Sequence, residues 1–180
     1  MGFFGRLLGH PTAEAPPATV KPVARPDPTP VPSPGPTQGI AYDPKLVPSL
    51  LEEHAQLGKL FGQIGEMHRA GNADGVCRLL SQFKSRIEAH VLTENVRFYN
   101  FLEQSMRGDG ANVELMRSFR RDMNDIVRQV INFVKRYQQE YPTPQGAASF
   151  GAAYQEIAVL LERRLDSEEG SLYPMYVKPA

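Results

Sequence analysis

His90 and Glu94 stand four residues apart in a segment whose apolar residues recur at steps of three and four. On a helix, this spacing places the imidazole and the carboxylate one above the other on a single face. The same face carries the apolar positions that should pack into the core. Burying an imidazole and a carboxylate is unfavourable unless they are ion-paired, hydrogen-bonded or bound to a metal. This pair is therefore the first candidate for a functional site.

A second segment, near the C-terminus, repeats the pattern of the first. Residues 164–173 (RLDSEEGSLY) align without a gap with residues 90–99 (HVLTENVRFY). Both segments carry an acid at the fifth position, a large apolar residue at the ninth and tyrosine at the tenth. Glu168 is the acid of the second copy. At the first position, Arg164 stands where the first copy has His90, and this difference bears on every metal-binding hypothesis.

The repeat extends to the helices that precede these two segments. Two short segments, residues 53–57 and 122–126, each begin with an acidic residue. In both, apolar residues follow at the spacing of a helix. The chain therefore resembles two helical hairpins related by a pseudo-twofold axis. The chemically interesting positions of the two halves are His54, His90 and Glu94 in the first, and Met123, Arg164 and Glu168 in the second.

The apolar periodicity predicts four long helices and no strands. Order should begin near Asp43, and Asn112 is expected to cap the third helix. Short turns between long helices favour antiparallel neighbours, so the fold class is all-α, an up-down-up-down four-helix bundle. The expected helices cover approximately residues 44–71, 73–106, 112–141 and 145–173.

Prolines separate the N-terminal part of the chain from this bundle. Ten of the 16 prolines fall between Pro11 and Pro36, a composition that favours an extended, disordered linker. We predict three parts: a short apolar segment, a disordered Pro-rich linker and the bundle, at residues 1–9, 10–41 and 42–177. Residues 1–9 are expected to be a frayed tail, with weak peripheral contact to a membrane or a partner as the alternative.

Composition excludes several functional classes. With 20 basic and 20 acidic residues in 180, the chain lacks the positive charge of a general nucleic-acid binder. A single cysteine, Cys77, cannot form an intrachain disulfide and fits a reducing cytoplasm. The sequence shows no nucleophile–base pair, no Gly-rich phosphate loop and no cysteine cluster. We therefore predict a cytoplasmic protein that is not an enzyme and has no catalytic residues.

A histidine on the first helix, His-x-x-x-Glu on the second and Glu-Glu-x-x-Leu-Tyr-Pro on the fourth resemble the hemerythrin-like (HHE) family over residues 44–176. The resemblance implies a bundle whose core holds two irons bridged by two carboxylates, in proteins that bind dioxygen or sense oxygen, nitric oxide or iron. It also implies that His54 and His90 are terminal ligands. Glu94 and Glu168 would be the bridging acids.

Two positions depart from this family pattern. Met123 stands where the third helix should supply a ligand, and that helix contains no histidine. On the fourth helix the position is taken by Arg164, whose guanidinium has no lone pair for a metal. A guanidinium can instead hydrogen-bond carboxylates in bidentate fashion. We therefore predict that an Arg–carboxylate network replaces the diiron centre.

The functional prediction follows from that replacement. We expect a non-catalytic regulatory or partner-binding module, with no cofactor and an unidentified protein partner. The alternative is a sensor of dioxygen, nitric oxide or iron that retains one iron on a residual site. Its ligands would be His54, His90, Glu94 and Glu168. Two other polar side chains, His68 and Glu169, are expected to be solvated.

Overall fold

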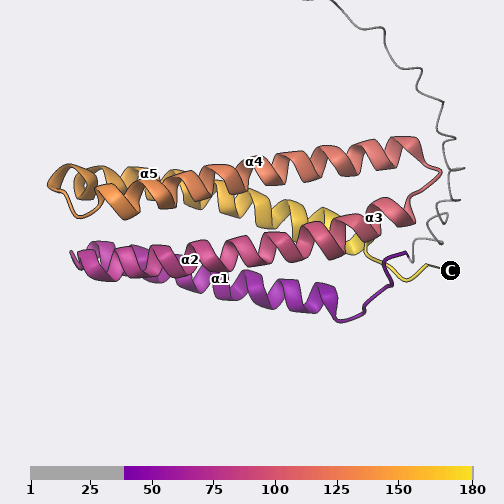
Figure 1. Cartoon of the computed structure of the whole chain (residues 1–180), viewed down its shortest axis with the longest axis horizontal. Coiled ribbons are helices and arrows are strands. Elements are labelled where there is room, and N and C mark those ends of the chain that lie inside the picture. Colours follow the sequence, from indigo (N-terminus) through magenta and orange to yellow (C-terminus); the bar gives the residue numbers. More distant parts are fainter. Residues whose placement is uncertain (1–38, 180) are drawn as a thin grey trace, which may run out of the picture. The chain divides into compact units, whose positions relative to one another are not determined.

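The computed structural model describes residues 39–179, which contain no strand and form four helical rods (Figure 1). The first and third rods are single helices, α1 (Leu46–Arg69) and α4 (Gly110–Glu140). The second rod runs through three elements, namely α2 (Ala73–Thr93), the π-helix η1 (Glu94–Tyr99) and α3 (Asn100–Ser105). The fourth rod does the same through α5 (Pro144–Ser167), the π-helix η2 (Glu168–Leu172) and the 3₁₀ turn η3 (Tyr173–Met175).

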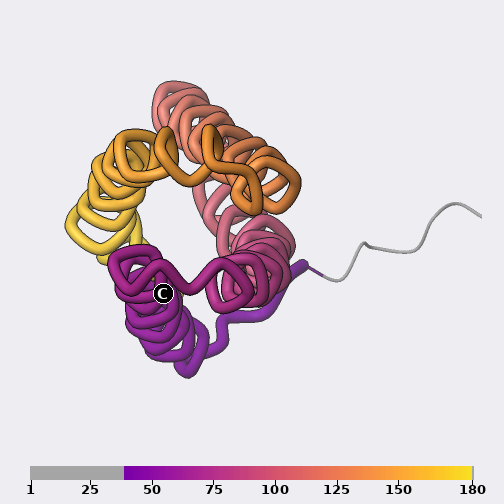
Figure 2. The backbone as a smooth tube through the Cα atoms, turned by 90° about the vertical axis from the view of Figure 1, so that its left-hand side faces the viewer, coloured from indigo at the N-terminus to yellow at the C-terminus, as the bar shows by residue number. Residues whose placement is uncertain are grey.

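Each rod packs against two others. α1 contacts α2 and α5, while α4 contacts the same two helices from the other side. Viewed end-on, the rods therefore form a ring of four (Figure 2). Consecutive rods run antiparallel because short turns join them (Figure 1). The predicted up-down-up-down bundle is confirmed.

Apolar and aromatic side chains fill one half of the bundle. Phe150 of α5 is fully buried, with the rings of Tyr137 and Tyr141 against it at centroid distances of 5.0 and 4.9 Å. His68 belongs to this cluster, since its ring lies 4.9 Å from Phe150 and its Nδ1 lies 2.9 Å from the Tyr141 hydroxyl. The prediction that His68 is solvated was wrong, because the turn after α4 brings Tyr141 against the end of α1.

Side-chain caps fix the helix starts. Asp109, which follows Gly108 at φ +106°, caps α4 by accepting a hydrogen bond from the Asn112 backbone N–H. The prediction that Asn112 is the cap was therefore wrong by one turn. Asn112 lies inside that turn, and its side chain donates to Asp109 Oδ2 at 2.7 Å. Thr143 caps α5 in the same way, with Pro144 in the first turn.

The second and fourth rods also differ from the regular helices that the periodicity predicted. Each passes from α-helix into a π-helix, in which hydrogen bonds span five residues instead of four. Glu94 begins one π-helix and Glu168 begins the other. The two acids singled out by the sequence thus occupy equivalent positions, each at the first residue of a π-helix.

The described part of the chain begins just before α1. The Ile40 backbone N–H donates to Gln104 Oε1 at 2.8 Å, and the ring of Tyr42 stacks on that of Tyr176. The predicted apolar segment (1–9) and most of the predicted linker (10–41) lie outside the described residues. Among residues 39–179, no helix combines the length and the apolar character needed to cross a membrane. The cytoplasmic location stays a prediction.

Candidate metal centre

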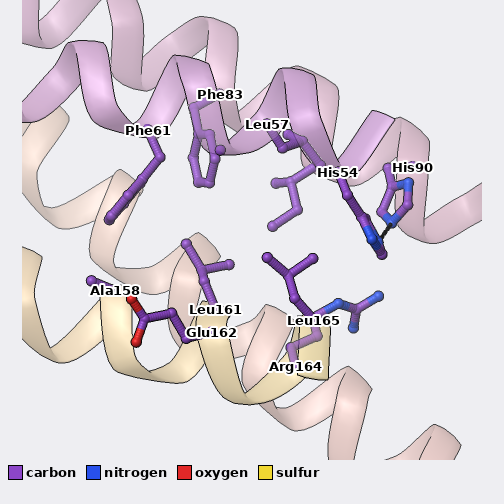
Figure 3. Close-up of a pocket in the computed structure, with 12 residues that line it drawn as sticks. His54, Leu57, Phe61, Phe83, His90, Ala158, Leu161, Glu162, Arg164 and Leu165 are labelled. Carbon is purple, nitrogen blue, oxygen red and sulfur yellow. Dashed lines mark hydrogen bonds between the residues drawn. The ribbon is translucent and has the colours of Figure 1, made fainter. Parts of the chain in front are cut away.

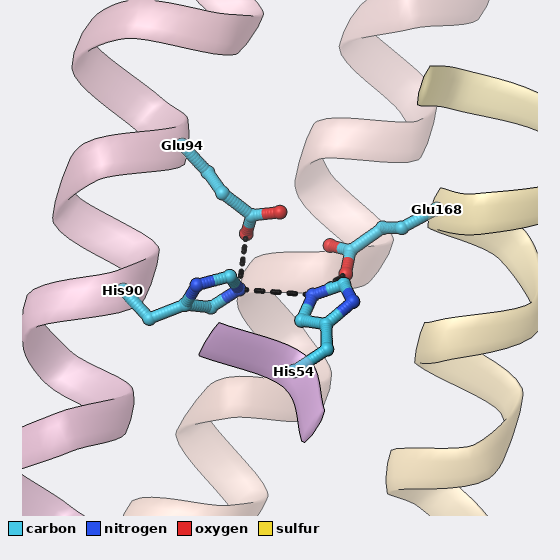
Figure 4. Close-up of side chains that lie close together, drawn as sticks. All are labelled: His54, His90, Glu94 and Glu168. Carbon is cyan, nitrogen blue, oxygen red and sulfur yellow. Dashed lines mark hydrogen bonds and ion pairs between the residues drawn. The ribbon is translucent and has the colours of Figure 1, made fainter. Parts of the chain in front are cut away.

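Four side chains that the sequence singled out meet in the bundle core (Figure 4). His54, His90, Glu94 and Glu168 each offer one ligand atom, and these atoms all lie within 4.8 Å of one another. The four residues are only 0–5% exposed. They come from α1, the end of α2 and the first residues of the two π-helices. The fold therefore gathers two imidazoles and two carboxylates in the buried core of the bundle.

The two imidazoles face each other through their Nε2 atoms, which are 3.1 Å apart. Each ring is held from behind by a carboxylate, since His54 Nδ1 lies 2.7 Å from Glu169 Oε1 and His90 Nδ1 lies 2.8 Å from Glu53 Oε2. A carboxylate acceptor fixes a proton on Nδ1, which leaves the Nε2 lone pair free. Two lone pairs this close repel each other unless a proton or a metal cation lies between them.

Sequence reasoning missed the two acids that orient these rings. Glu169 was predicted to be solvated, and its side chain is 44% exposed, but its Oε1 also lies 2.7 Å from His54 Nδ1, a contact that the sequence did not indicate. Glu53 was noticed only as the acid that leads its segment, although it binds His90. Glu53 and Glu169 each bind a histidine of a different helix. Residue spacing along one helix therefore could not indicate these contacts.

The π-helices explain how the acidic ligands are placed. A five-residue hydrogen-bonding step brings residues five apart towards the same face, and both copies place an acid five residues before a tyrosine. Glu94 and Tyr99 are buried, as are Glu168 and Tyr173. Tyr173 donates to Glu94 Oε1 at 2.8 Å, and burial raises the pKa of Tyr173, which keeps this donor proton in place. The hydroxyl of Tyr99 finds no hydrogen-bond partner among residues 39–179.

Arg120 of α4 stabilises the π-helix that carries Glu94. Its Nη2 donates to the Asn95 backbone carbonyl at 3.2 Å, and its Nε donates to Asn95 Oδ1 at 2.9 Å. Its Nη1 contacts Glu103 at 3.0 Å. A π-helix disturbs the regular backbone pairing, and Arg120 supplies a donor at the residue after Glu94. The contact helps to fix the position of the Glu94 carboxylate.

Arg164 lies between the two buried acids. Its Nη2 donates to Glu94 Oε2 and lies 2.7 Å from Glu168 Oε1. Its Nη1 donates to the backbone carbonyl of Met123 at 3.2 Å. Arg164 and Met123 are both 3% exposed. Arg164 therefore directs its positive charge at both carboxylates, and it is held by the backbone of Met123, the other position that departs from the ligand pattern.

Burial and neighbouring charges shift the pKa values of Glu94 and Arg164. Burial raises the pKa of Glu94, and the neighbouring Glu168 raises it further, while Arg164 opposes both effects. Burial alone would lower the pKa of Arg164, but the two carboxylates outweigh that effect and raise it. The guanidinium therefore stays charged and is the main stabilising partner of two acids that would otherwise repel each other.

The two histidines are shifted in opposite directions. Burial tends to lower the pKa of His54, but hydrogen bonds to Glu168 and Glu169 outweigh it, so the pKa is raised. For His90, burial is the largest effect and its pKa is lowered, although Glu94 partly opposes this. In the absence of a metal, an additional proton is therefore favoured on His54, between the two facing Nε2 atoms.

The donor set fits one cation. Glu168 is fully buried, and Arg164 Nη2 lies 2.7 Å from its Oε1 while His54 Nε2 lies 3.4 Å from its Oε2. A buried carboxylate beside two imidazole nitrogens is a suitable donor set for a divalent transition metal. Arg164, which offers no lone pair to a metal, contacts both acids, at Glu168 Oε1 and at Glu94 Oε2, the oxygen that lies 3.5 Å from His90 Nε2.

A comparison with protein families agrees with this geometry. The family model described as the hemerythrin HHE cation binding domain matches residues 45–176, well over half of the chain. No curated protein and no solved structure matches the chain.

Proposed function

This chain belongs to the hemerythrin HHE cation-binding family, and we propose that it is a regulatory module that binds a single iron. His54, His90, Glu94 and Glu168 would hold the metal. The main support is the pair of Nε2 atoms 3.1 Å apart, each on a ring whose Nδ1 is bound to a carboxylate. Metal-binding histidines commonly have such a carboxylate behind them, which fixes the tautomer and makes the ring a better donor.

Each residue of the centre has a distinct task in this proposal. The imidazoles supply nitrogen donors, and Glu53 and Glu169 hold the rings in place. Tyr173 orients the Glu94 carboxylate by donating a hydrogen bond to Oε1, while the guanidinium of Arg164 binds Oε2 and neutralises the charge. Bound iron supplies an Fe(II)/Fe(III) couple and a Lewis acid. The chain itself provides buried donors held in place by their neighbours, and we predict no catalytic residue.

Arg164 sets the number of metals. The resemblance to diiron proteins implies two acids that each bridge two cations. In this chain, one side of both acids is already bound by a guanidinium. One positive charge with directed hydrogen bonds would therefore stand in for the second iron.

A metal-free module that acts through a protein partner is the second candidate. It is favoured by the contacts of Arg164 with both acids, which stabilise the carboxylates without any metal. The raised pKa of His54 also favours it, since a proton on that ring then separates the two Nε2 atoms. In that case the bundle is a scaffold, and its exposed surface carries the function.

Metal analysis separates these candidates. Full-length protein, expressed with iron and purified anaerobically, is expected to contain one iron per chain by elemental mass spectrometry. His90→Ala should lose nearly all of it, because His90 supplies one of only two imidazoles in the centre. His68→Ala is the matched control, since His68 is a half-buried histidine of α1 that contacts Tyr141 instead, and it should retain the iron.

Two outcomes would contradict the proposal. Wild-type protein without metal, even after anaerobic reconstitution with Fe(II), would leave the metal-free module as the better interpretation. Two irons per chain would show that Arg164 leaves the second metal position accessible.

The acids behind the rings give a second prediction. Glu53→Ala should weaken iron binding by about 10–100-fold, the usual effect of removing a carboxylate behind a ligating histidine. Competition with a coloured chelator measures the affinity. Glu52→Ala is the control, because Glu52 is the preceding residue on α1 and contacts the exposed Gln56. Equal affinities in the two variants would mean that Glu53 does not orient His90.

A further inference from the structure

A cavity of about 220 Å³ opens between α1, α2 and α5 and ends at the two histidines (Figure 3). Its walls are mainly apolar, and Leu161 and Leu165 point from α5 towards α1 (Figure 3). The apolar lining residues are Leu57, Phe61, Phe83, Ile87, Ala158, Leu161 and Leu165. Such a pocket next to polar groups is a common form of small-molecule site.

Aromatic packing and small residues define the shape of this pocket. The ring of Phe61 stacks on Tyr154 at 4.3 Å and lies 5.4 Å from the ring of Phe83, which fixes one wall. Gly58, on the same helix as Phe61, also lines the pocket, and a Cβ added there would meet nothing within 4 Å. Ala158 is the smallest of the residues that α5 contributes to the lining. The absence of bulk at these two positions leaves the cavity open.

The volume indicates a ligand larger than a diatomic gas. An apolar cavity of roughly 150 Å³ is enough to stay dry and bind benzene, and this one is larger. One or two fused rings would therefore fit.

The charges around the cavity select against anions. Arg164 lines the inner end, but both buried acids already bind it. Glu162 lines the wall and adds negative charge (Figure 3). His54, the other group that can carry positive charge here, is contacted by Glu168 and Glu169. An anionic ligand would thus lose hydration without gaining a free cationic partner. One polar group on a neutral ligand could still be directed at the histidine end.

We propose that this pocket binds a neutral aromatic molecule of one or two rings. The ligand would lie against the wall formed by Phe61 and Phe83, with its edge near His54 and His90. The proposal needs no metal, because the walls belong to the bundle itself.

Indole is a suitable probe, because the chain has no tryptophan and indole fluorescence can be followed directly. Full-length protein in the presence of a chelator is expected to bind indole saturably, one molecule per chain. Gly58→Leu should raise the Kd at least about tenfold by filling the pocket. Gly62→Leu, one turn further along α1, also points into open space but does not line the cavity, so its Kd should match the wild-type value.

Both leucine substitutions improve helix propensity, so both variants should fold, and Ala158→Phe tests the opposite wall. Indole-3-acetate, which adds a carboxylate to the same ring, should bind at least about tenfold more weakly than indole. Three results would overturn the proposal: indole binding without saturation, equal weakening by Gly58→Leu and Gly62→Leu, or indole-3-acetate binding as tightly as indole. Loss of iron binding would leave it intact.

Discussion

Arg164→Ala should lower the free energy of unfolding of the metal-free protein by about 3–5 kcal/mol at pH 7, the usual effect of removing one partner from a buried ion pair. The variant loses the guanidinium that contacts both Glu94 and Glu168. Two buried carboxylates then lie close together with no cation from α5 between them. Urea unfolding in the presence of a chelator measures the change.

The loss should be smaller at pH 5 than at pH 7. Burial and Glu168 already raise the pKa of Glu94, and Arg164 is the main group that opposes them. Without Arg164, one carboxyl of the pair has a folded-state pKa well above its unfolded value. Its protonated form then favours folding at low pH, and that contribution is lost as the pH rises through the folded-state pKa.

Arg163→Ala is the matched control, because Arg163 is the preceding residue on α5 and is exposed. It should change the free energy of unfolding by no more than about 0.5 kcal/mol. Arg164→Lys should lie between the two, since it keeps the charge but not the planar fork. If Arg164→Ala proved as stable as Arg163→Ala at pH 7, the guanidinium would not be the group that stabilises the two acids.

Returning imidazoles to the two divergent positions should raise the metal content from one iron per chain to two. In the double variant Met123→His and Arg164→His, the guanidinium is removed and two nitrogen donors are added beside Glu94 and Glu168. Both positions are buried and the Arg164 side chain reaches the Met123 backbone carbonyl, so we expect both new rings to enter the same part of the core. Iron should also raise the thermal unfolding midpoint of this variant more than that of the wild type. Each metal that binds only the folded state adds its own contribution to the free energy of unfolding.

Met123→His combined with Arg163→His controls for the number of added histidines. It retains Arg164, so its iron content should stay at one per chain. If the double variant at Met123 and Arg164 also held a single iron while folded, the spacing of α4 and α5 would not suit a second metal. Arg164 would then not be what limits the number of metals.

Sequence periodicity predicted the bundle, and the repeated segments together with the resemblance to the HHE family indicated the four core residues of the candidate centre. A helix repeats every 3.6 residues, so residues spaced by three and four share a face regardless of the rest of the fold. His54, His90, Glu94 and Glu168 follow that spacing, and their burial could be predicted from it. The repeated segment also identified Arg164 as the position that differs between the halves.

The orientation of the imidazoles was decided only by tertiary structure. Glu53 binds His90 on the next helix, and Glu169 binds His54 across the bundle. Such contacts depend on the axial offset of neighbouring helices, which side-chain packing sets and local spacing does not. Without them, the facing Nε2 atoms would not indicate a cation site.

The π-helices are a second feature that sequence alone did not reveal. The acid and tyrosine of each copy are five residues apart in the sequence, but an α-helix remained the better local prediction. The π-helix at Glu94 is supported by Arg120 of α4, which donates to the Asn95 carbonyl. The sequence also predicted that Arg164 lies on the inner face of its helix. Its contact with Glu94 was found only in the structure, because the distance between side chains of two helices depends on how closely the helices pack.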